Sequence, residues 1–360
     1  MATTFKTLNA KDVISTRNLL HEAIPITGQI VSGTYADNNI KNFSHGIFQS
    51  VYDYPYLSSS ANHIFDLTAG YSNVSALSGA THSQNAKKIN IYNQMAQVLV
   101  GFDENNDVRR FDEDGNLTDG GTKINEAFII NFTRLLTKDE VKKGSFTLEL
   151  GVSASYLAPF GQRITLKDND GINSYKVNSP VGEYGILYAE NSTGTPLNGV
   201  TASTQQPAGL IYYQAGMAVV TASVFSGLLS SSISSVFTAS VDGPSPDKID
   251  AVLTGSTIKL NCDELRHRIY DLSFNNSVEL NSTVYFCRAN HNEFNYSANP
   301  TYLSASKLVV KNDSADVPVS YATTVGLYSP DNELLAVAKL SEPLKKDPTT
   351  EFTLRVRLDY

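Results

Sequence analysis

The segment from Asn191 to Val241 contains no Lys, Arg, Asp, Glu or His. Its centre, AGLIYYQAGMAVVTASVFSGLL, is long enough to suggest a membrane-spanning helix. Against this, several glycines and Gln214 interrupt the run, Tyr212 and Tyr213 lie in its middle, and no basic residues flank it. The runs GLIYY and MAVVTASVF, separated by the turn-forming triplet QAG, instead predict a buried β-hairpin that a Ser-rich helix or loop follows.

The composition bounds the class of protein. With 360 residues, of which 41% are hydrophobic, the chain can bury a large core and is too apolar to be disordered. The balance of 28 basic and 36 acidic residues gives a net charge of −8, which excludes the basic surface of a nucleic-acid-binding protein. Two cysteines are too few for a disulfide scaffold.

Local patterns predict a mainly β, α+β fold with a few short helices, built from antiparallel sheets or a β-sandwich. The clearest helix is 84–100, where Ile91, Met95, Val98 and Leu99 form an apolar stripe. A second short helix is predicted over 8–24, ending at Pro25.

Strands are predicted for many short apolar runs bounded by turn residues. In EFTLRVRLDY, apolar residues from Phe352 to Leu358 alternate with polar ones, which is typical of a half-buried strand and ties the C-terminus into a sheet. The turn APFG at 158–161 suggests a boundary between a mixed α/β region, 1–160, and a β-rich region, 161–360. The other predicted strands are EAFIINFTRLL, SFTLELGVSA, STIKLNC, RIYDLSF, STVYFC, KLVV, VSYATTVGLYS and ELLAVAKLS.

Aromatic side chains mark candidate contact surfaces. Tyr52, Tyr54 and Tyr56 would project from one face of an extended chain, either into the core or toward a partner. Pro55 prevents a ladder hydrogen bond there, so this segment is an edge strand or an irregular loop. A second aromatic and Asn-rich loop covers 290–302. The interface candidates are Tyr52, Tyr54, Tyr56, Tyr212, Tyr213, Phe294, Tyr296 and Tyr302.

Two weak metal patterns occur. The spacings from Cys262 to His267 and from Cys287 to His291 supply four ligands of the kind that zinc prefers, although buried thiols explain both cysteines more simply. The acidic loop 102–123 alternates oxygen ligands as a calcium loop does, but it lacks the glycine and glutamate that such a loop needs. The sequence therefore predicts a hairpin turn in this loop, no cofactor and no resident metal.

No catalytic residue is predicted. The chain has no G-x-S-x-G elbow, no P-loop, no H-E-x-x-H pair and no dinucleotide-binding glycine motif. His45 and His63 lie near Asp53 and Asp66, where hydrogen-bonding structural roles are expected. A glycosidase stays possible, because such enzymes need only two suitably separated carboxylates. The N-terminal residues lack a signal-peptide pattern, which indicates synthesis and folding in the cytoplasm.

Several longer segments of the sequence resemble virion structural proteins of tailed bacteriophages with contractile tails. They are IFQSVYDYPYLSSSANHIFDLTAGYS, GLIYYQAGMAVVTAS, NEFNYSANPTY, TTVGLYSPDNELLAVAKLSEPLKK and EFTLRVRLDY. The resemblance implies a non-enzymatic tail subunit, in particular of the baseplate, located in the virion after assembly in the host cytoplasm. Its partners would be other virion proteins or copies of itself, with no nucleic acid and no membrane. It assigns no role to any individual residue.

Three alternatives stay open beside the baseplate. The first is a neck or capsid-associated virion protein. The second is a module that binds host-surface glycans through the loops 52–62 and 290–302, and the third is an enzyme that acts on polysaccharide or peptidoglycan. Uncharged Ser-, Asn- and Tyr-rich surfaces lose less hydration energy at an interface than charged ones, so the uncharged segment is where an interface is expected.

Overall fold

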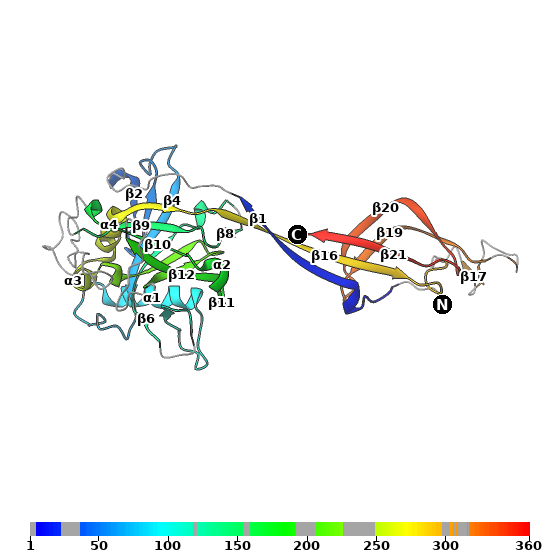
Figure 1. The fold of residues 1–360 in the computed structure, drawn as a ribbon, viewed down its shortest axis with the longest axis horizontal. Helices are drawn as coiled ribbons and strands as arrows, with labels where there is room; N and C mark the ends of the chain where they lie inside the picture. Colours follow the sequence, from blue (N-terminus) through cyan, green and yellow to red (C-terminus); the bar gives the residue numbers. More distant parts are fainter. Residues whose placement is uncertain are drawn as a thin grey trace. The chain divides into compact units, whose positions relative to one another are not determined.

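The computed structural model describes residues 5–22, 37–117, 121–137, 139–153, 159–191, 206–225, 249–296, 303–304, 307–308, 315 and 317–360 (Figure 1). The chain forms two compact units. We call Leu20–Val278 the large unit, and Met1–Leu19 together with Glu279–Tyr360 the split unit. Two strands, β1 (Val13–Glu22) and β16 (Asn276–Ala289), contain residues of both. The mainly β, α+β fold with antiparallel sheets is confirmed.

The large unit is built on an 11-stranded sheet, and every strand pairing among the described residues of this sheet is antiparallel. The order is β15 (Ile269–Ser273), β9 (Thr147–Gly151), β10 (Arg163–Lys167), β12 (Gly182–Asn191), β13 (Pro207–Tyr212), β14 (Met217–Thr221), β7 (Glu126–Asn131), β4 (His63–Tyr71), β3 (Gln49–Tyr52) and β2 (Ile40–Asn42), with β11 (Lys176–Ser179) beside β12. Shorter strands are β5 (Phe111–Asp112) with β6 (Lys123–Ile124), and β8 (Glu140–Val141) beside β16.

The charge-free hairpin lies inside this sheet. As predicted, β13 and β14 pair with each other, with Leu210 opposite Val219 and Tyr212 opposite Met217. Both strands have further sheet neighbours, and nearly all their side chains are buried. A strand that is covered on both faces cannot carry unpaired charges, which explains its composition. The Ser-rich continuation lies outside the described residues.

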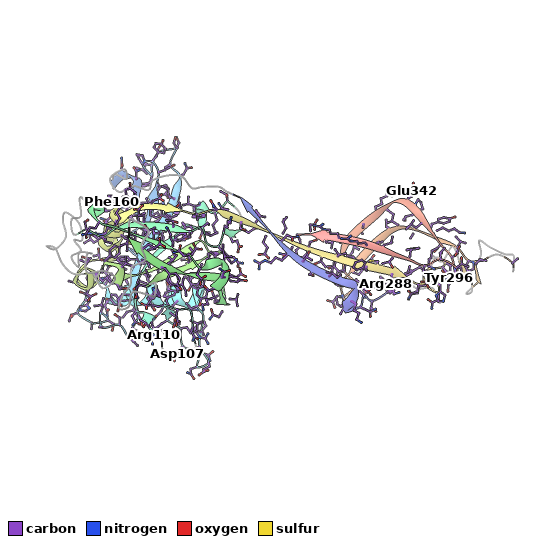
Figure 2. All side chains as sticks on the ribbon, in the orientation of Figure 1. Asp107, Arg110, Phe160, Arg288, Tyr296 and Glu342 are labelled. Carbon is purple, nitrogen blue, oxygen red and sulfur yellow. The ribbon has the colours of Figure 1, made fainter. Side chains whose placement is uncertain are left out.

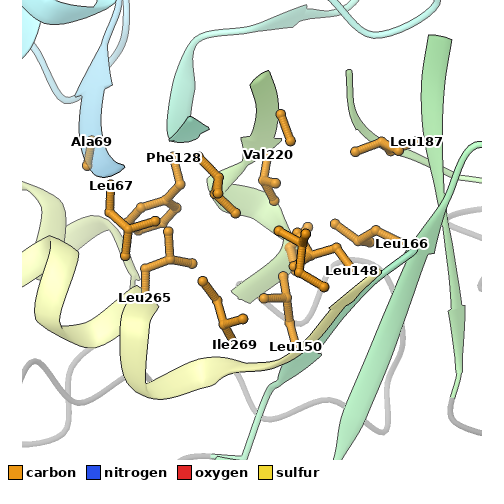
Figure 3. Packing of buried hydrophobic residues seen from close by; sticks show 14 of the residues in the cluster. Leu67, Ala69, Phe128, Leu148, Leu150, Leu166, Leu187, Val220, Leu265 and Ile269 are labelled. Carbon is orange, nitrogen blue, oxygen red and sulfur yellow. The ribbon is translucent and has the colours of Figure 1, made fainter. Parts of the chain in front are cut away.

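Helices cover both faces of the sheet. On one face, α3 (Ile249–Gly255) and α4 (Ile258–Arg268) close the larger hydrophobic cluster, in which Leu265 and Ile269 lie near Phe128, Leu148 and Leu150 (Figure 3). On the other face, Tyr92, Ala96 and Leu99 of α1 (Asn85–Leu99) pack with Ile129, Leu210 and Val219. Alternate residues of the central strands therefore serve two different cores.

The helix predicted at 84–100 is confirmed as α1, although Val98, placed in its apolar stripe, is exposed. Two other local predictions were wrong. The expected helix at 8–24 is strand β1, because pairing with β16 overrides a weak helical spacing. The expected strand STIKLNC is the start of α4, where Thr257 accepts a hydrogen bond from the backbone N–H of Leu260 at 3.4 Å.

The boundary between the two compact units does not lie near residue 160. The segment Pro159–Gly161 is a short 3-10 turn that connects β9 with β10, and these strands are hydrogen-bonded neighbours. The boundaries instead fall within β1 and β16. The division predicted at 160 therefore differs from that of the structure, because a surface turn inside a sheet looks like a linker in sequence.

The described residues of the split unit take part in three small sheets. β16 pairs with β1 and with β21 (Phe352–Asp359), which sets Tyr285 opposite Val356. β19 (Ser320–Tyr328) and β20 (Leu334–Lys346) form a hairpin, and β17 (Leu303–Ser304) pairs with β18 (Lys307–Leu308). The predicted alternation along β21 is confirmed, since its apolar residues are the less exposed ones.

Candidate functional surfaces

Two of the predicted interface residues belong to the core of the large unit. The ring of Tyr212 stacks on that of Tyr184, with centroids 5.1 Å apart, and burial raises the pKa of Tyr212 well above its ordinary value. Tyr213 is equally buried and donates a hydrogen bond to Asp168 at 3.2 Å. Their assignment to a contact surface was wrong, because the end of β13 and the residue after it lie within a sheet that is covered on both faces.

The tyrosine-rich segment is an irregular surface loop. β3 ends at Tyr52, and Asp53 then accepts hydrogen bonds from the backbone and side-chain N–H groups of Asn62 at 2.6 and 2.8 Å. This bridge closes a loop that carries the exposed rings of Tyr54 and Tyr56. The predicted edge or loop is therefore present, but the three tyrosines do not lie along one strand face.

The second aromatic loop is anchored by a buried lysine. The ammonium group of Lys346 donates hydrogen bonds to Asn295 Oδ1 at 2.6 Å and to the backbone oxygen of His291 at 3.2 Å. Phe294 and Tyr296 are half-buried, with Phe294 at a positive φ of 55°. Tyr302 lies outside the described residues, so only part of this surface can be placed.

The four candidate zinc ligands are divided between the units. Cys262 of α4 is buried and donates its thiol hydrogen to the Leu67 backbone oxygen at 3.3 Å, and the ring of His267 contacts the backbone oxygen of Asp263. Cys287 and His291 belong to the split unit. Within the described ranges, no group of three or more His, Cys, Asp and Glu side chains is arranged to hold a metal ion.

The two histidines near the tyrosine-rich segment make local hydrogen bonds. His63 Nε2 lies 2.7 Å from Asp66 Oδ1, and Ser50 donates a hydrogen bond to the same oxygen at 2.5 Å. The carboxylate thus separates the hydroxyl from the imidazole, whereas a serine nucleophile needs direct contact with its base. His45 Nδ1 accepts the backbone N–H of Ile47 at 3.0 Å.

A buried ion pair within α4 was missed by sequence reasoning. Arg268 Nε lies 2.9 Å from Glu264 Oε1, and both side chains are at most 1% exposed. The same guanidinium donates hydrogen bonds to the backbone oxygens of Gly151 and Ser153 at 3.1 and 2.7 Å. Burial raises the pKa of Glu264 to about 7, while the neighbouring Arg268 opposes this rise. The i,i+4 spacing of Glu264 and Arg268 was the available signal, had the segment been recognised as helical.

Asp168 is another buried acid of the large unit. Its two oxygens accept the backbone N–H groups of Gly144 and Phe146 at 2.6 and 2.9 Å, so it fixes the chain that leads into β9. Burial raises its pKa to about 6, although these hydrogen bonds and that of Tyr213 oppose the rise.

This acid predicts a specific pH dependence of stability. Unfolded Asp168 releases its proton near pH 3.8 and the folded form near pH 6, so the folded state binds more protons between these values. Its contribution to the free energy of unfolding is therefore largest below pH 3.8 and should decrease by about 3 kcal/mol as the pH rises through 6. Urea denaturation of the wild type and of Asp168→Asn across this range measures the difference. Parallel pH profiles of the two proteins would contradict the expectation.

The split unit has little hydrophobic core of its own. Among its described residues, the buried apolar side chains are Val284, Ala289 and Val356, at 7–9% exposure. Figure 2 shows side chains projecting from its strands, with Glu342 labelled on β20. Its exposed large apolar residues are Phe5, Leu8, Ile14, Leu280, Val317, Tyr321, Tyr328, Leu334, Leu335, Val337, Leu344 and Tyr360.

This distribution is the reverse of that in the large unit, where both sheet faces are packed. Isolated exposed apolar residues are ordinary, but a unit that exposes more large apolar residues than it buries presents a surface for contact. The exposed residues gather on β19 and β20, a two-stranded hairpin, and a hairpin of this size is marginally stable unless other structure covers it. We therefore take the split unit as the principal candidate functional surface.

Sequence and structure comparisons complete the description of these surfaces. None of the helices in the described part of the chain is long and apolar enough to cross a membrane, and the longest of them, α1, has 15 residues. No protein-family model, no curated protein and no solved structure matches this chain.

Proposed function

We propose that the chain is a non-enzymatic structural subunit of a tailed-bacteriophage particle, located in the tail baseplate and acting through subunit–subunit interfaces. The observation that carries the proposal is the exposed apolar surface of the split unit, described above. A permanently assembled subunit can leave a unit without a full core, because neighbouring subunits complete it. The resemblance of several sequence segments to phage virion proteins supports the choice of this assembly.

The distribution of polar groups in the large unit agrees with a structural role. Two of its buried acids, Asp168 and Glu264, are held by backbone N–H groups or by an arginine of the same helix. The cluster of Ser50, His63 and Asp66 lacks the hydroxyl–imidazole contact that nucleophilic catalysis requires. These contacts of the large unit agree with a subunit that acts through its surfaces.

Localisation in particles tests this function. Gold-labelled antibodies against the full-length chain should mark purified virions of the phage that encodes it, at the tail end distal to the head. Antibody preadsorbed with the purified chain is the control. Label at the head–tail junction or on the capsid would replace the baseplate with the neck or capsid alternative, and particles that lack the chain would overturn the whole proposal.

Glycan binding is the second candidate, and the exposed loop with Tyr54 and Tyr56 is the observation in its favour. The two Asp53–Asn62 hydrogen bonds close the base of that loop, and such cross-links favour a preorganised binding loop. The chain purified from these particles can be screened against host-surface glycans. Specific binding would favour the glycan-binding role over the structural one. We rank this role below the structural one because it leaves the split unit unexplained.

A further inference from the structure

The hairpin of β19 and β20 carries an apolar patch near its turn. Val337 lies opposite Gly326, and a Cβ placed on Gly326 would meet the Tyr328 ring at 2.9 Å and Leu334 at 3.3 Å, so these side chains share one face. The Phe5 ring contacts that of Tyr328 edge-on, with centroids 5.4 Å apart. We define the hairpin patch as Phe5, Tyr328, Leu334, Leu335 and Val337, which are 48–68% exposed.

The patch has the apolar area that a stable interface needs. Five large apolar side chains exposed by about half to two-thirds present on the order of 500 Å² of apolar surface. A typical stable interface buries about 800 Å² on each partner, of which about 60% is apolar. The hairpin patch therefore supplies the apolar share of one complete interface.

Acidic residues lie at one end of the patch and a basic residue lies at the other, so two copies in opposite directions can pair these charges. Asp331 and Glu333 lie at the turn, and Lys339 lies beyond Val337 on the same face. All three are exposed, and none of them takes part in an ion pair with the described residues. Glu333 and Lys339 are about 20 Å apart along an extended strand, too far to pair within one chain.

A two-fold axis near Ala336, midway between these charges, would bring them together. Two hairpins stacked in opposite directions would then place apolar patch on apolar patch, with Glu333 of each chain beside Lys339 of the other. In such an isologous interface every contact occurs twice. Acidic residues at one end of the patch and a lysine at the other are an arrangement that a second copy in the opposite direction complements.

We propose that two copies of this chain associate face to face through the hairpin patch, with reciprocal Glu333–Lys339 contacts. The inference rests on the proposed function, since it names one of the partners of the subunit as a second copy. The two can fail separately: self-association is measured on purified protein, whereas the proposed function is measured in particles.

Sedimentation velocity of the full-length chain tests the association. The wild type should sediment as a dimer at micromolar concentration, and Leu335→Glu/Val337→Glu should be monomeric, because charges would then enter the apolar contact. Leu57→Glu is the matched control, since Leu57 is 84% exposed but lies in the large unit. A monomeric wild type, or dimers that persist in the double variant, would overturn the proposal.

Charge exchange tests the reciprocal contact without altering the apolar residues. Glu333→Lys and Lys339→Glu should each raise the dimer Kd about 10- to 30-fold, because each creates two like-charge contacts. An equimolar mixture of the two single variants should recover wild-type affinity, since both contacts in the mixed dimer are again between opposite charges. Absence of recovery in the mixture, with both variants folded by circular dichroism, refutes this pairing.

Discussion

Arg268→Met should lower the free energy of unfolding by about 3–5 kcal/mol. The substitution keeps most of the apolar stem but removes the only charge that lies beside Glu264 Oε1 in the described structure, and it leaves the Gly151 and Ser153 oxygens without this donor. Without Arg268, the buried Glu264 must either stay charged and unpaired or take up a proton on folding, and both destabilise the folded state.

Chemical denaturation measures this loss, and a double-mutant cycle shows how much of it comes from the Glu264–Arg268 interaction. Glu264→Gln/Arg268→Met should lose clearly less than the sum of the single variants, because the uncharged amide tolerates burial better than an unpaired carboxylate. Arg357→Met is the matched control, since its pair with Asp359 is more than half exposed, and it should lose less than about 1 kcal/mol. Equal losses at positions 268 and 357 would show that the buried pair is not specially important.

Gly70→Val should destabilise the large unit by about 3 kcal/mol or more, at the upper end of the range for overpacked cores. At Gly70, helix α1 approaches strand β4 so closely that a Cβ would lie 2.5 Å from the Lys88 backbone oxygen and 3.1 Å from the Tyr92 backbone nitrogen. Neither backbone atom can rotate away, so the whole helix would have to shift from the sheet.

A graded series identifies the cause. Gly70→Ala should lose about 1–3 kcal/mol and Gly70→Val more, because the steric conflict grows with the side chain. Gly255→Ala, where a Cβ would meet no atom within 4 Å, should be neutral or stabilising by up to about 1 kcal/mol. A loss at position 255 as large as that at position 70 would show that the close helix–strand approach is not the cause.

Sequence patterns predicted those elements whose periodicity is set by strong burial. The β13–β14 hairpin lies in the middle of a covered sheet, and α1 and β21 each bury one side, so hydrophobic residues recur at the spacing of the element. The fold class followed from these elements, together with the many short strand-like runs.

The wrong predictions each have a physical cause. Residues 13–22 carry a weak helical spacing, and only β16, which lies far away in sequence, makes them a strand. The start of α4 is rich in residues that suit strands, and the cap at Thr257 was overlooked. Tyr212 and Tyr213 were assigned to a contact surface because an uncharged segment can equally be an interface or an interior.

The hairpin patch could not be derived from sequence. The strands β19 and β20 were predicted correctly, but alternation alone assigns one face to a core, and the structure leaves residues of both faces exposed. Whether an apolar strand face is covered depends on the rest of the fold, which local patterns do not contain.

The segments of the split unit also set an order of events during synthesis. The large unit is continuous in sequence, so it can begin to fold on the ribosome, whereas β1 must wait for β16, which follows more than 250 residues later. The sheet of β1, β16 and β21 therefore forms late, once β21 has emerged. A chain that terminates before β16 would lack this sheet and the hairpin of β19 and β20, and with them the surface through which association is proposed.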